Sequence, residues 1–270
     1  MSLSEFELID RFFKSRMTGG LHPAVSLGIG DDAAIMRGRT GQSLCVCTDV
    51  LVSGVHFPAG ADPAEIGQRA LRVNLSDLAA MGALPIGFTL GLTLPSADER
   101  WLSGFSSGLF GAAEQFGCSL MGGDTTRGPL SISITAIGEV PSGQAVSRSG
   151  AKPGDVLYVT GCLGDGQVAL HQLDFEAAES TAHEPALAEA GHKSVRKDLT
   201  PEDNAYLYRR FFRPEPRLAF ADRARNLMSS AIDVSDGLHA DAGHLARASA
   251  VGLRINLDQP PFSRSVLGLT

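Results

Sequence analysis

The sequence has few aromatic residues and fewer basic than acidic side chains. Aromatic residues make up 6% of its 270 residues, and only one is tryptophan. Its 23 lysines and arginines, set against 30 aspartates and glutamates, leave a formal net charge of −7. Nucleic-acid binding needs a basic surface, and an anionic membrane likewise attracts basic segments. We therefore expect neither a nucleic acid nor a membrane among its partners.

Cysteine is also scarce. The four cysteines form no CxxC pair and show no spacing typical of tetrahedral zinc or of a disulfide framework. Buried thiols in a reducing compartment are the expected state. The N-terminal segment 1–17 is amphipathic and lacks a basic region followed by a continuous apolar run. No secretory signal is therefore predicted, and the expected location is the cytoplasm.

One long uncharged stretch, between Asp77 and Asp98, raises the question of a membrane-spanning helix. Glycines and prolines interrupt this stretch, and its apolar residues alternate with period two from Ile86 to Leu94. A period of two is typical of a β-strand, so we predict a strand here.

Several common nucleotide-binding and hydrolase motifs are missing. The sequence has no GxxxxGK[ST] loop, no protein-kinase catalytic loop, no GxSxG and no HExxH. The segment Gly28–Ala33 fits the pattern GxGxxA, but Gly38 and Gly41 interrupt the helix that a dinucleotide-binding loop must open. Its two adjacent carboxylates would also repel a phosphate unless a metal ion lay between them. A Rossmann site is therefore rejected.

The length predicts two domains. The segment 141–154 is rich in Gly, Ser and Pro, which places the expected domains at 1–148 and 149–270. Alternating strand and helix patterns predict an α/β (α+β) fold. In the first domain we expect helices over 1–17, 63–81 and 96–116, with strands at 33–36, 44–47, 86–94, 119–121 and 131–140. In the second we expect strands at 156–160, 230–234 and 252–257, helices from 166 and over 217–228 and 238–249, and a helical or partly disordered stretch at 171–206.

Five short segments end in, or lead into, an aspartate set among glycine, serine or threonine. A single aspartate in such a setting is usually a turn or capping residue, but five are hard to explain as turns alone. Asn74 and Asp77 lie three residues apart and would share one face of a helix. The five segments are Gly30–Asp32, Thr48–Asp49, Asn74–Asp77, Gly122–Thr126 and Asp233–Gly237.

Carboxylates that cluster without cysteine or histidine suit a hard cation. Mg²⁺ prefers oxygen ligands and is typically shared between a few carboxylates and the phosphates of a substrate. Several Mg²⁺ ions would offset the repulsion between the aspartates and would let an acidic protein bind a polyphosphate. The pattern therefore points to phosphoryl transfer, in which the protein mainly positions the reactants and neutralises charge.

Four other features have two interpretations each. His56 could contact a substrate phosphate or ring, or it could be structural. Arg148 could steady nucleotide phosphates or be a solvated linker residue; the same choice applies to Arg127, for which we favour a surface role. The turn Gly161–Gly166 could hold a phosphate at a helix N-terminus, although an ordinary strand-to-helix turn is the preferred interpretation.

Taken in order, these segments resemble the thiamine-monophosphate kinase family, and the resemblance spans nearly the whole chain. Related aminoimidazole-ribonucleotide-synthetase-like enzymes share the two-domain plan and the SDG-type site, whereas the combination of NLSDLAAMGA with VHF points to the thiamine branch. The matching segments are GIGDDAA (28–34), TDVLVSGVHF (48–57), NLSDLAAMGALP (74–85), GGDTTRGP (122–129), SRSGAKPGD (147–155) and IDVSDGL (232–238).

The resemblance implies ATP-dependent phosphorylation of thiamine monophosphate to thiamine diphosphate by direct in-line transfer at a site with several Mg²⁺ ions. It also implies a homodimer formed by packing of the N-terminal sheets. The implied metal ligands are Asp32, Cys47 through its main-chain oxygen, Thr48, Asp49, Asp77, Asp124, Asp233 and Asp236. The implied nucleotide contacts are Gly123, Asp124, Arg148 and Ser235, and His56 is the implied contact to thiamine phosphate. Cys47 stands where serine is common in the family, and Asp31 is expected outside the ligand shell.

One family feature is missing before Thr270, the last residue. Family members carry a GGEDYELLF-like segment and an aromatic residue near the C-terminus, both part of the thiamine site. The second domain is therefore expected to be truncated. Two other functions stay open: a different ATP-using enzyme of the same superfamily, such as an amidine-forming synthetase, and a nucleotide-binding module without an acceptor site.

Overall fold

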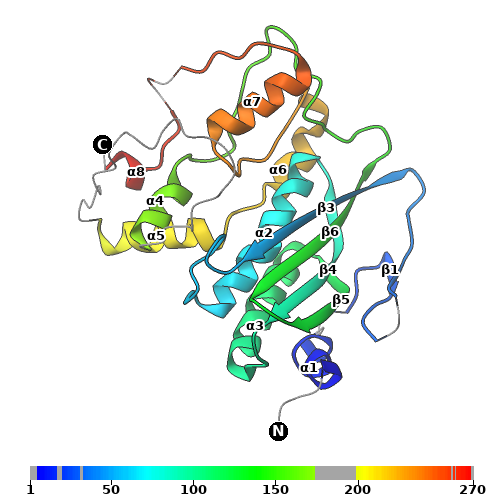
Figure 1. Cartoon of the computed structure of the whole chain (residues 1–270). Coiled ribbons are helices and arrows are strands. Elements are labelled where there is room, and N and C mark those ends of the chain that lie inside the picture. Colours follow the sequence, from blue (N-terminus) through cyan, green and yellow to red (C-terminus); the bar gives the residue numbers. More distant parts are fainter. Residues whose placement is uncertain are drawn as a thin grey trace.

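A four-stranded sheet with the strand order β3-β6-β4-β5 lies at the centre of the first half of the chain (Figure 1). The structure, a computed structural model, describes residues 5–16, 20–30, 33–173, 199–256, 258 and 260–268. Strand β6 is antiparallel to both β3 and β4, and β4 is parallel to β5, so β3 and β5 form the two edges. The strands are β3 (Gln42–Val52), β4 (Leu84–Leu94), β5 (Ser119–Arg127) and β6 (Ser131–Pro141).

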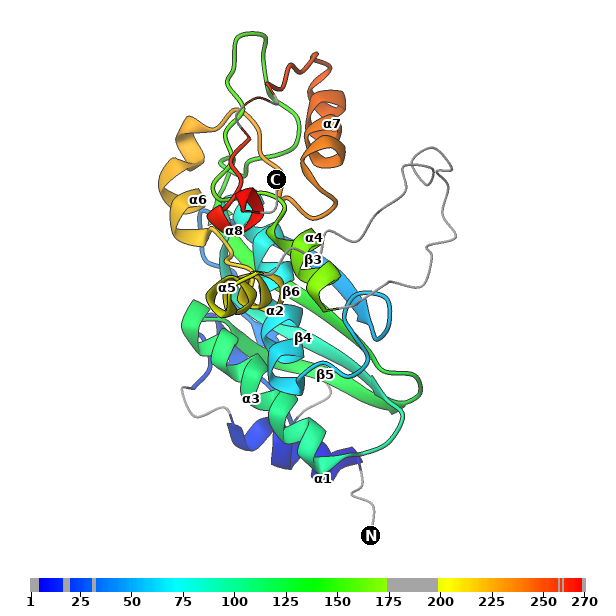
Figure 2. The same ribbon diagram turned by 90° about the vertical axis from the view of Figure 1, so that its left-hand side faces the viewer.

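Two long helices, α2 (Pro63–Ala80) and α3 (Glu99–Phe116), cover one face of this sheet (Figure 2). The strand predicted for 86–94 is confirmed as part of β4. Phe88, Leu90 and Leu92 point into the core beneath the helices, whereas Ile86, at a register shift, packs on the opposite face. Asp62 and Asp98 accept hydrogen bonds from the first backbone N–H groups of α2 and α3 and so fix where these helices begin. The cap of α3 is thus Asp98, whereas the sequence pattern favoured an earlier start at 96.

The opposite face of the sheet is only partly covered. A short hairpin of β1 (Val25–Leu27) and β2 (Ile35–Met36) packs over Ile86 and Met121 near one end. At the β3 edge the face carries exposed apolar side chains, including Val46, which is 63% exposed, and Leu44 and Val50. The amphipathic N-terminal segment forms α1 (Glu5–Phe12) and a 3₁₀ turn, η1 (Lys14–Arg16), a shorter helix than predicted.

After β6, the regular elements among the described residues are all helices. Figure 1 shows α4, α5 and α8 close together at one side, and α6 packs against α2. Residues 174–198, most of the stretch predicted as helical or partly disordered, lie outside the described residues, and α5 begins after them. Among the described helices, none is both long and apolar enough to cross a membrane. The elements are α4 (Asp165–Gln172), α5 (Pro201–Phe212), α6 (Leu218–Ala224), η2 (Arg225–Leu227), α7 (Leu238–Ser249) and α8 (Arg264–Leu267).

The three strands predicted in the second half are wrong for the described residues. Segments 156–160, 230–234 and 252–256 are not in strands, and an isolated bridge from Leu163 to Phe262 is the only pairing among the residues of this region that the structure describes. Val156 and Tyr158 are 69% and 81% exposed. An apolar alternating run predicts which face of a strand is buried, but a strand forms only where a second backbone accepts its hydrogen bonds.

Candidate active site

Three of the predicted aspartates come together where β3, α2 and the segment before α7 meet. Burial, followed by repulsion from Asp233 and Asp49, raises the pKa of Asp77 to about 7, while Arg148 lowers it. Burial also raises the pKa of Asp49 and of Asp233, and each of these carboxyls is close enough to another of the three to influence its ionisation. The three therefore form an acidic cluster of half-buried carboxylates.

A buried asparagine joins β3 to α2 at this cluster. Asn74 is fully buried, accepts a hydrogen bond from the backbone N–H of Asp49 (3.1 Å) and donates one to the carbonyl of Ala70 (3.0 Å). One turn further along α2, Asp77 projects from the same face, as its spacing from Asn74 predicts. The thiol of Cys47 donates to the carbonyl of Asn74 (3.3 Å), and burial raises its pKa to about 12. This sulfur therefore stays protonated, and only the main-chain oxygen of Cys47 suits a metal ion.

Replacing Asn74 with Ala should lower the free energy of unfolding by about 1–3 kcal/mol, because the N–H of Asp49 loses its acceptor in a buried position. Turnover should fall as well, since Asp49 is no longer fixed against α2. Chemical denaturation and steady-state kinetics measure the two effects. The same change at the exposed Asn204 is the control and should alter stability by less than about 0.5 kcal/mol. If the denaturation midpoint of Asn74→Ala were unchanged, water would replace the amide as hydrogen-bond acceptor without loss of stability.

Arg148 reaches the acidic cluster because its segment is tied to the second half of the chain. The carbonyl of Ser147 accepts a hydrogen bond from the N–H of Ala231 (3.0 Å), and the carbonyl of Arg148 accepts one from the hydroxyl of Ser249 (3.1 Å). The guanidinium of Arg148 lowers the pKa of both Asp77 and Asp233. Arg148 is thus an exposed cation beside the carboxylates, which is the placement a phosphate contact requires.

His56 lies in a tight loop at the end of β3. The buried ring of Phe57 anchors this loop, and the N–H of Gly54 donates to the carbonyl of Phe57 (2.9 Å). The Nδ1 atom of His56 accepts a hydrogen bond from the N–H of Val52 (3.0 Å), so a neutral ring carries its proton on Nε2. The ring is exposed and lies close to Asp49. Its Nε2 atom is therefore free to bind a ligand next to the cluster.

Ser235 and Asp236 belong to an exposed turn immediately before α7. The buried carboxylate of Asp241, in the first turn of α7, accepts hydrogen bonds from three consecutive N–H groups with one oxygen, Oδ2. These donors are Ser235 (3.0 Å), Asp236 (3.1 Å) and Gly237 (3.0 Å). Asp241 thus fixes the backbone conformation of the turn.

Not all predicted ligands come together within one chain. The hydroxyl of Thr48 faces the open side of the sheet and is hydrogen-bonded to Thr135 (2.9 Å), on the opposite face from Asp49. Asp124 and Gly123 lie on the other edge strand, because Asp49 pairs with Ile134, Ile134 with Leu90 and Leu90 with Gly123. Three strand spacings separate Asp49 from Gly123, or roughly 14 Å.

Asp32 lies outside the described residues. Among those that the structure describes, no three His, Cys, Asp or Glu side chains lie close enough together to hold one metal ion. The donor chemistry nevertheless suits Mg²⁺. The acidic cluster offers only carboxylate oxygens, and their mutual repulsion is what a divalent cation would relieve.

Three residues near the cluster were missed as site residues by the sequence analysis. Asn74 and Asp241 act through backbone N–H groups, as described above. Arg69, on α2, stacks on the ring of Phe211 at 4.1 Å and donates to its carbonyl, and its charge lowers the pKa of Asp49. Arg69 leaves no trace in the sequence. The spacing of Asn74 from Asp77 places both on one helix face, and Asp241 is an acidic residue in the first turn of a helix that follows a glycine turn.

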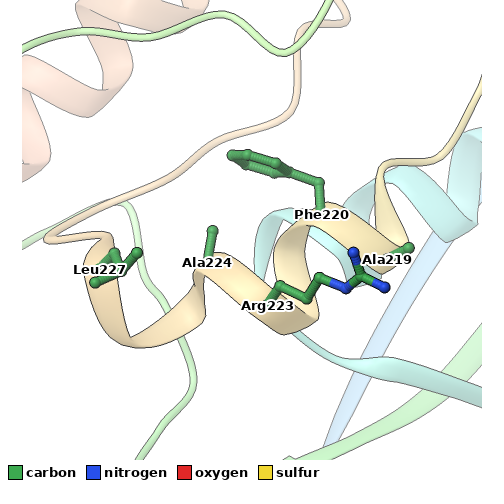
Figure 3. Close-up of a pocket in the computed structure, with 5 residues that line it drawn as sticks. All are labelled: Ala219, Phe220, Arg223, Ala224 and Leu227. Carbon is green, nitrogen blue, oxygen red and sulfur yellow. The ribbon is translucent and has the colours of Figure 1, made fainter.

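A surface pocket of about 440 Å³ lies on α6 and η2 (Figure 3). Its side chains are mostly apolar, with Leu227 86% exposed. The lining residues, none of them a predicted ligand, are Ala219, Phe220, Arg223, Ala224 and Leu227.

Comparison with known proteins first shows the broad class to which this chain belongs. Residues 30–140 match the N-terminal domain, and residues 152–269 the C-terminal domain, of AIR synthase related proteins. The chain is thus an AIR-synthase-related protein. Over 263 residues the chain is 46% identical to the thiamine-monophosphate kinase of Escherichia coli K12, covering 97% of this chain and 74% of that protein. It is also 43% identical to the Salmonella typhimurium enzyme, over 99% of this chain and 76% of that protein. The chain belongs to the thiamine-monophosphate kinase family.

Solved structures agree with this assignment. The crystal structure of thiamine-monophosphate kinase from Stenotrophomonas maltophilia K279a matches with a TM-score of 0.82 and 42% identity, over 100% of this chain and 80% of that one. AaThiL complexed with AMPPCP and TMP matches with a TM-score of 0.73 and 31% identity, over 100% of this chain and 79% of that one. The family predicted from the sequence motifs is therefore confirmed.

Proposed function

We propose that this chain uses ATP to phosphorylate thiamine monophosphate, giving thiamine diphosphate and ADP. The observation that carries the proposal is the half-buried acidic cluster of Asp49, Asp77 and Asp233 with Arg148 and His56 beside it. A relative at 31% identity binds an ATP analogue together with TMP. The site therefore combines carboxylates for cations with two groups suited to phosphates.

The chemistry is an in-line transfer between two phosphates. The bond from the γ-phosphorus of ATP to its bridging oxygen breaks, and a bond forms to a terminal oxygen of thiamine monophosphate. That oxygen is anionic near neutral pH, because the second pKa of a phosphate monoester lies near 6. No general base is then required, which agrees with the lack of any predicted catalytic residue.

When bound, Mg²⁺ would supply the charge neutralisation that phosphoryl transfer needs. The residues proposed to hold it are Asp32, the main chain of Cys47, Thr48, Asp49, Asp77, Asp124, Asp233 and Asp236. On the nucleotide side, Arg148 binds phosphate oxygens, Ser235 donates from its exposed turn, and the absence of a side chain at Gly123 lets the nucleotide approach the backbone. His56 orients the acceptor phosphate through Nε2–H. We assign dimerisation and most of the ATP and Mg²⁺ site to the domain 1–148, and the contacts of Asp233, Ser235 and Asp236 to the domain 149–270, in a cytoplasmic enzyme.

The distance between Asp49 and Asp124 favours a homodimer. If both residues serve one site, roughly 14 Å of sheet prevents them from meeting within one chain. The two residues lie on opposite edge strands, and a second copy whose open sheet face packs on that of the first can bring its β5 edge beside the β3 edge. The exposed apolar side chains Leu44, Val46 and Val50 suit such packing of the open sheet faces.

Introducing a charge on this face should separate the two copies. Val46→Glu is expected to convert the dimer to a monomer and to lower specific activity, because a carboxylate would be desolvated in the apolar interface. Light scattering coupled to size-exclusion chromatography measures the mass. Val156→Glu is the matched control, since Val156 is 69% exposed and lies off the sheet. A Val46→Glu protein that keeps the mass of the unmodified protein would place the interface elsewhere.

The kinase activity is tested with purified protein, ATP, Mg²⁺ and thiamine monophosphate, following thiamine diphosphate and ADP. Formation of both in equal amounts is the expected result. Inorganic phosphate released with a different substrate, and no reaction with thiamine monophosphate, would favour the amidine-forming synthetase. ATP binding in calorimetry without any binding of thiamine monophosphate would favour a nucleotide-binding module.

A further inference from the structure

The turn Ser235–Gly237 depends on a carboxylate outside the proposed ligand set. Its three N–H groups point to one place, where Oδ2 of Asp241 accepts all three bonds at 3.0–3.1 Å. Helix α7 has no other capping side chain, since its N-cap residue is Gly237. Convergent backbone N–H groups of this kind are a strong site for an anion, and here the protein's own carboxylate occupies it.

This arrangement determines which groups of the turn face outward. Asp241 is buried at 4% exposure, whereas Ser235 and Asp236 are exposed. With their N–H groups bound inward to Asp241, these two residues have their side chains free for a ligand. Asp241 also adds negative charge next to Asp233.

We propose that Asp241 is a positioning residue for the nucleotide half of the reaction: it holds the turn in the one conformation that presents Ser235 and Asp236 to Mg²⁺-bound ATP. This inference rests on the proposed function for the identity of the ligand. Asp241 does not touch the ligand itself, because its carboxylate is buried and engaged by the turn.

The first test is a kinetic comparison of Asp241→Asn with the unmodified protein. The amide keeps the size of the side chain but loses the charge that strengthens the three hydrogen bonds. The KM for ATP at saturating Mg²⁺ should rise by about 10- to 100-fold. This is the usual effect of losing a group that does not touch the ligand but orients the residues that do. The KM for thiamine monophosphate should change by less than about twofold, since His56 lies on a different loop. Equal increases in both KM values would overturn the proposal.

The control is Asp203→Asn. Asp203 is also a carboxylate at a helix N-terminus, where it accepts hydrogen bonds from Thr200 and from Ser265. Its removal should lower the melting temperature while leaving both KM values unchanged. If Asp203→Asn also raised the KM for ATP, a general loss of stability would explain the effect. The positioning role proposed for Asp241 would then be wrong.

The second test needs no turnover and therefore separates this inference from the proposed function. Amide hydrogen exchange should show protected N–H groups at Ser235, Asp236 and Gly237, and Asp241→Ala should abolish that protection while α3 stays protected. Calorimetry with AMPPCP and Mg²⁺ should show weaker binding to the same variant. Fast exchange in the unmodified protein, or unchanged AMPPCP affinity in the variant, would overturn the inference even if the protein proved not to be a kinase.

Discussion

Asp49→Asn should abolish formation of thiamine diphosphate while leaving the protein folded. Asp49 lies at the centre of the acidic cluster, where it influences the ionisation of both Asp77 and Asp233. Asparagine has the same shape but no charge, and loss of one fixed electrostatic group from a reacting site typically costs about 10²–10³ in turnover. In the absence of metal, the variant should unfold at a higher temperature, because repulsion with Asp77 is removed.

Mg²⁺ gives a second measurement, independent of turnover. A cation that binds only the folded protein raises its stability with concentration, so the melting temperature of the unmodified protein should rise with Mg²⁺, and that of Asp49→Asn should rise less. Asp98→Ala, which removes the cap of α3 far along the chain from the cluster, is the control. It should lower the melting temperature but keep both turnover and the response to Mg²⁺. Full turnover in Asp49→Asn would remove Asp49 from the proposed ligands.

Asp124→Asn extends the same experiment to the other edge of the sheet. Alone, it should be as inactive as Asp49→Asn. If the proposed dimer brings Asp124 of one copy to Asp49 of the other, mixing the two inactive variants should restore part of the activity, because one of the two sites in each mixed dimer carries no substitution. No recovery after subunit exchange, shown to be complete by mass spectrometry, would mean that each site is built from one chain.

Local patterns in the sequence predicted the parts of this site that depend on one element. Asn74 and Asp77 share a face because α2 is helical over both, and the hydrophobic period of 63–81 predicts that helix. The alternation of Ile86–Leu94 likewise predicted β4. In contrast, Thr48 and Asp49 were grouped as neighbours in sequence, although adjacent side chains on a strand point to opposite faces.

What the sequence did not predict depends on contacts between distant segments. Nothing in the pattern of Asn74 shows that its amide accepts the N–H of Asp49, since that bond depends on how α2 packs on β3. The strands expected at 156–160 and 230–234 failed for a similar reason, because their partners cannot be deduced from their own residues. Asp241 was accessible in principle: asking which group accepts the N–H bonds of the Ser235–Gly237 turn leads to the next buried carboxylate.

Gly123→Ala should be the most disruptive small substitution in the site. Gly123 faces Leu90 across the parallel pair of β5 and β4, with a φ of 155°, and a Cβ atom there would lie 2.8 Å from the carbonyl carbon of Leu90 and 2.9 Å from its nitrogen. These are backbone atoms in the middle of a sheet, so β5 itself must move. Overpacking of this kind costs about 1–3 kcal/mol or more.

The neighbouring glycine gives a matched control. A Cβ atom on Gly122 would meet nothing within 4 Å, so Gly122→Ala should change the free energy of unfolding by less than about 1 kcal/mol. Gly123→Ala should lower that free energy by several times as much and, where the protein still folds, raise the KM for ATP, because Asp124 moves with β5. Denaturant titration and kinetics of the two variants side by side measure both effects. Equal stability would show that β5 can withdraw from β4 at little cost, and the requirement for glycine at 123 would then belong to the nucleotide rather than to the sheet.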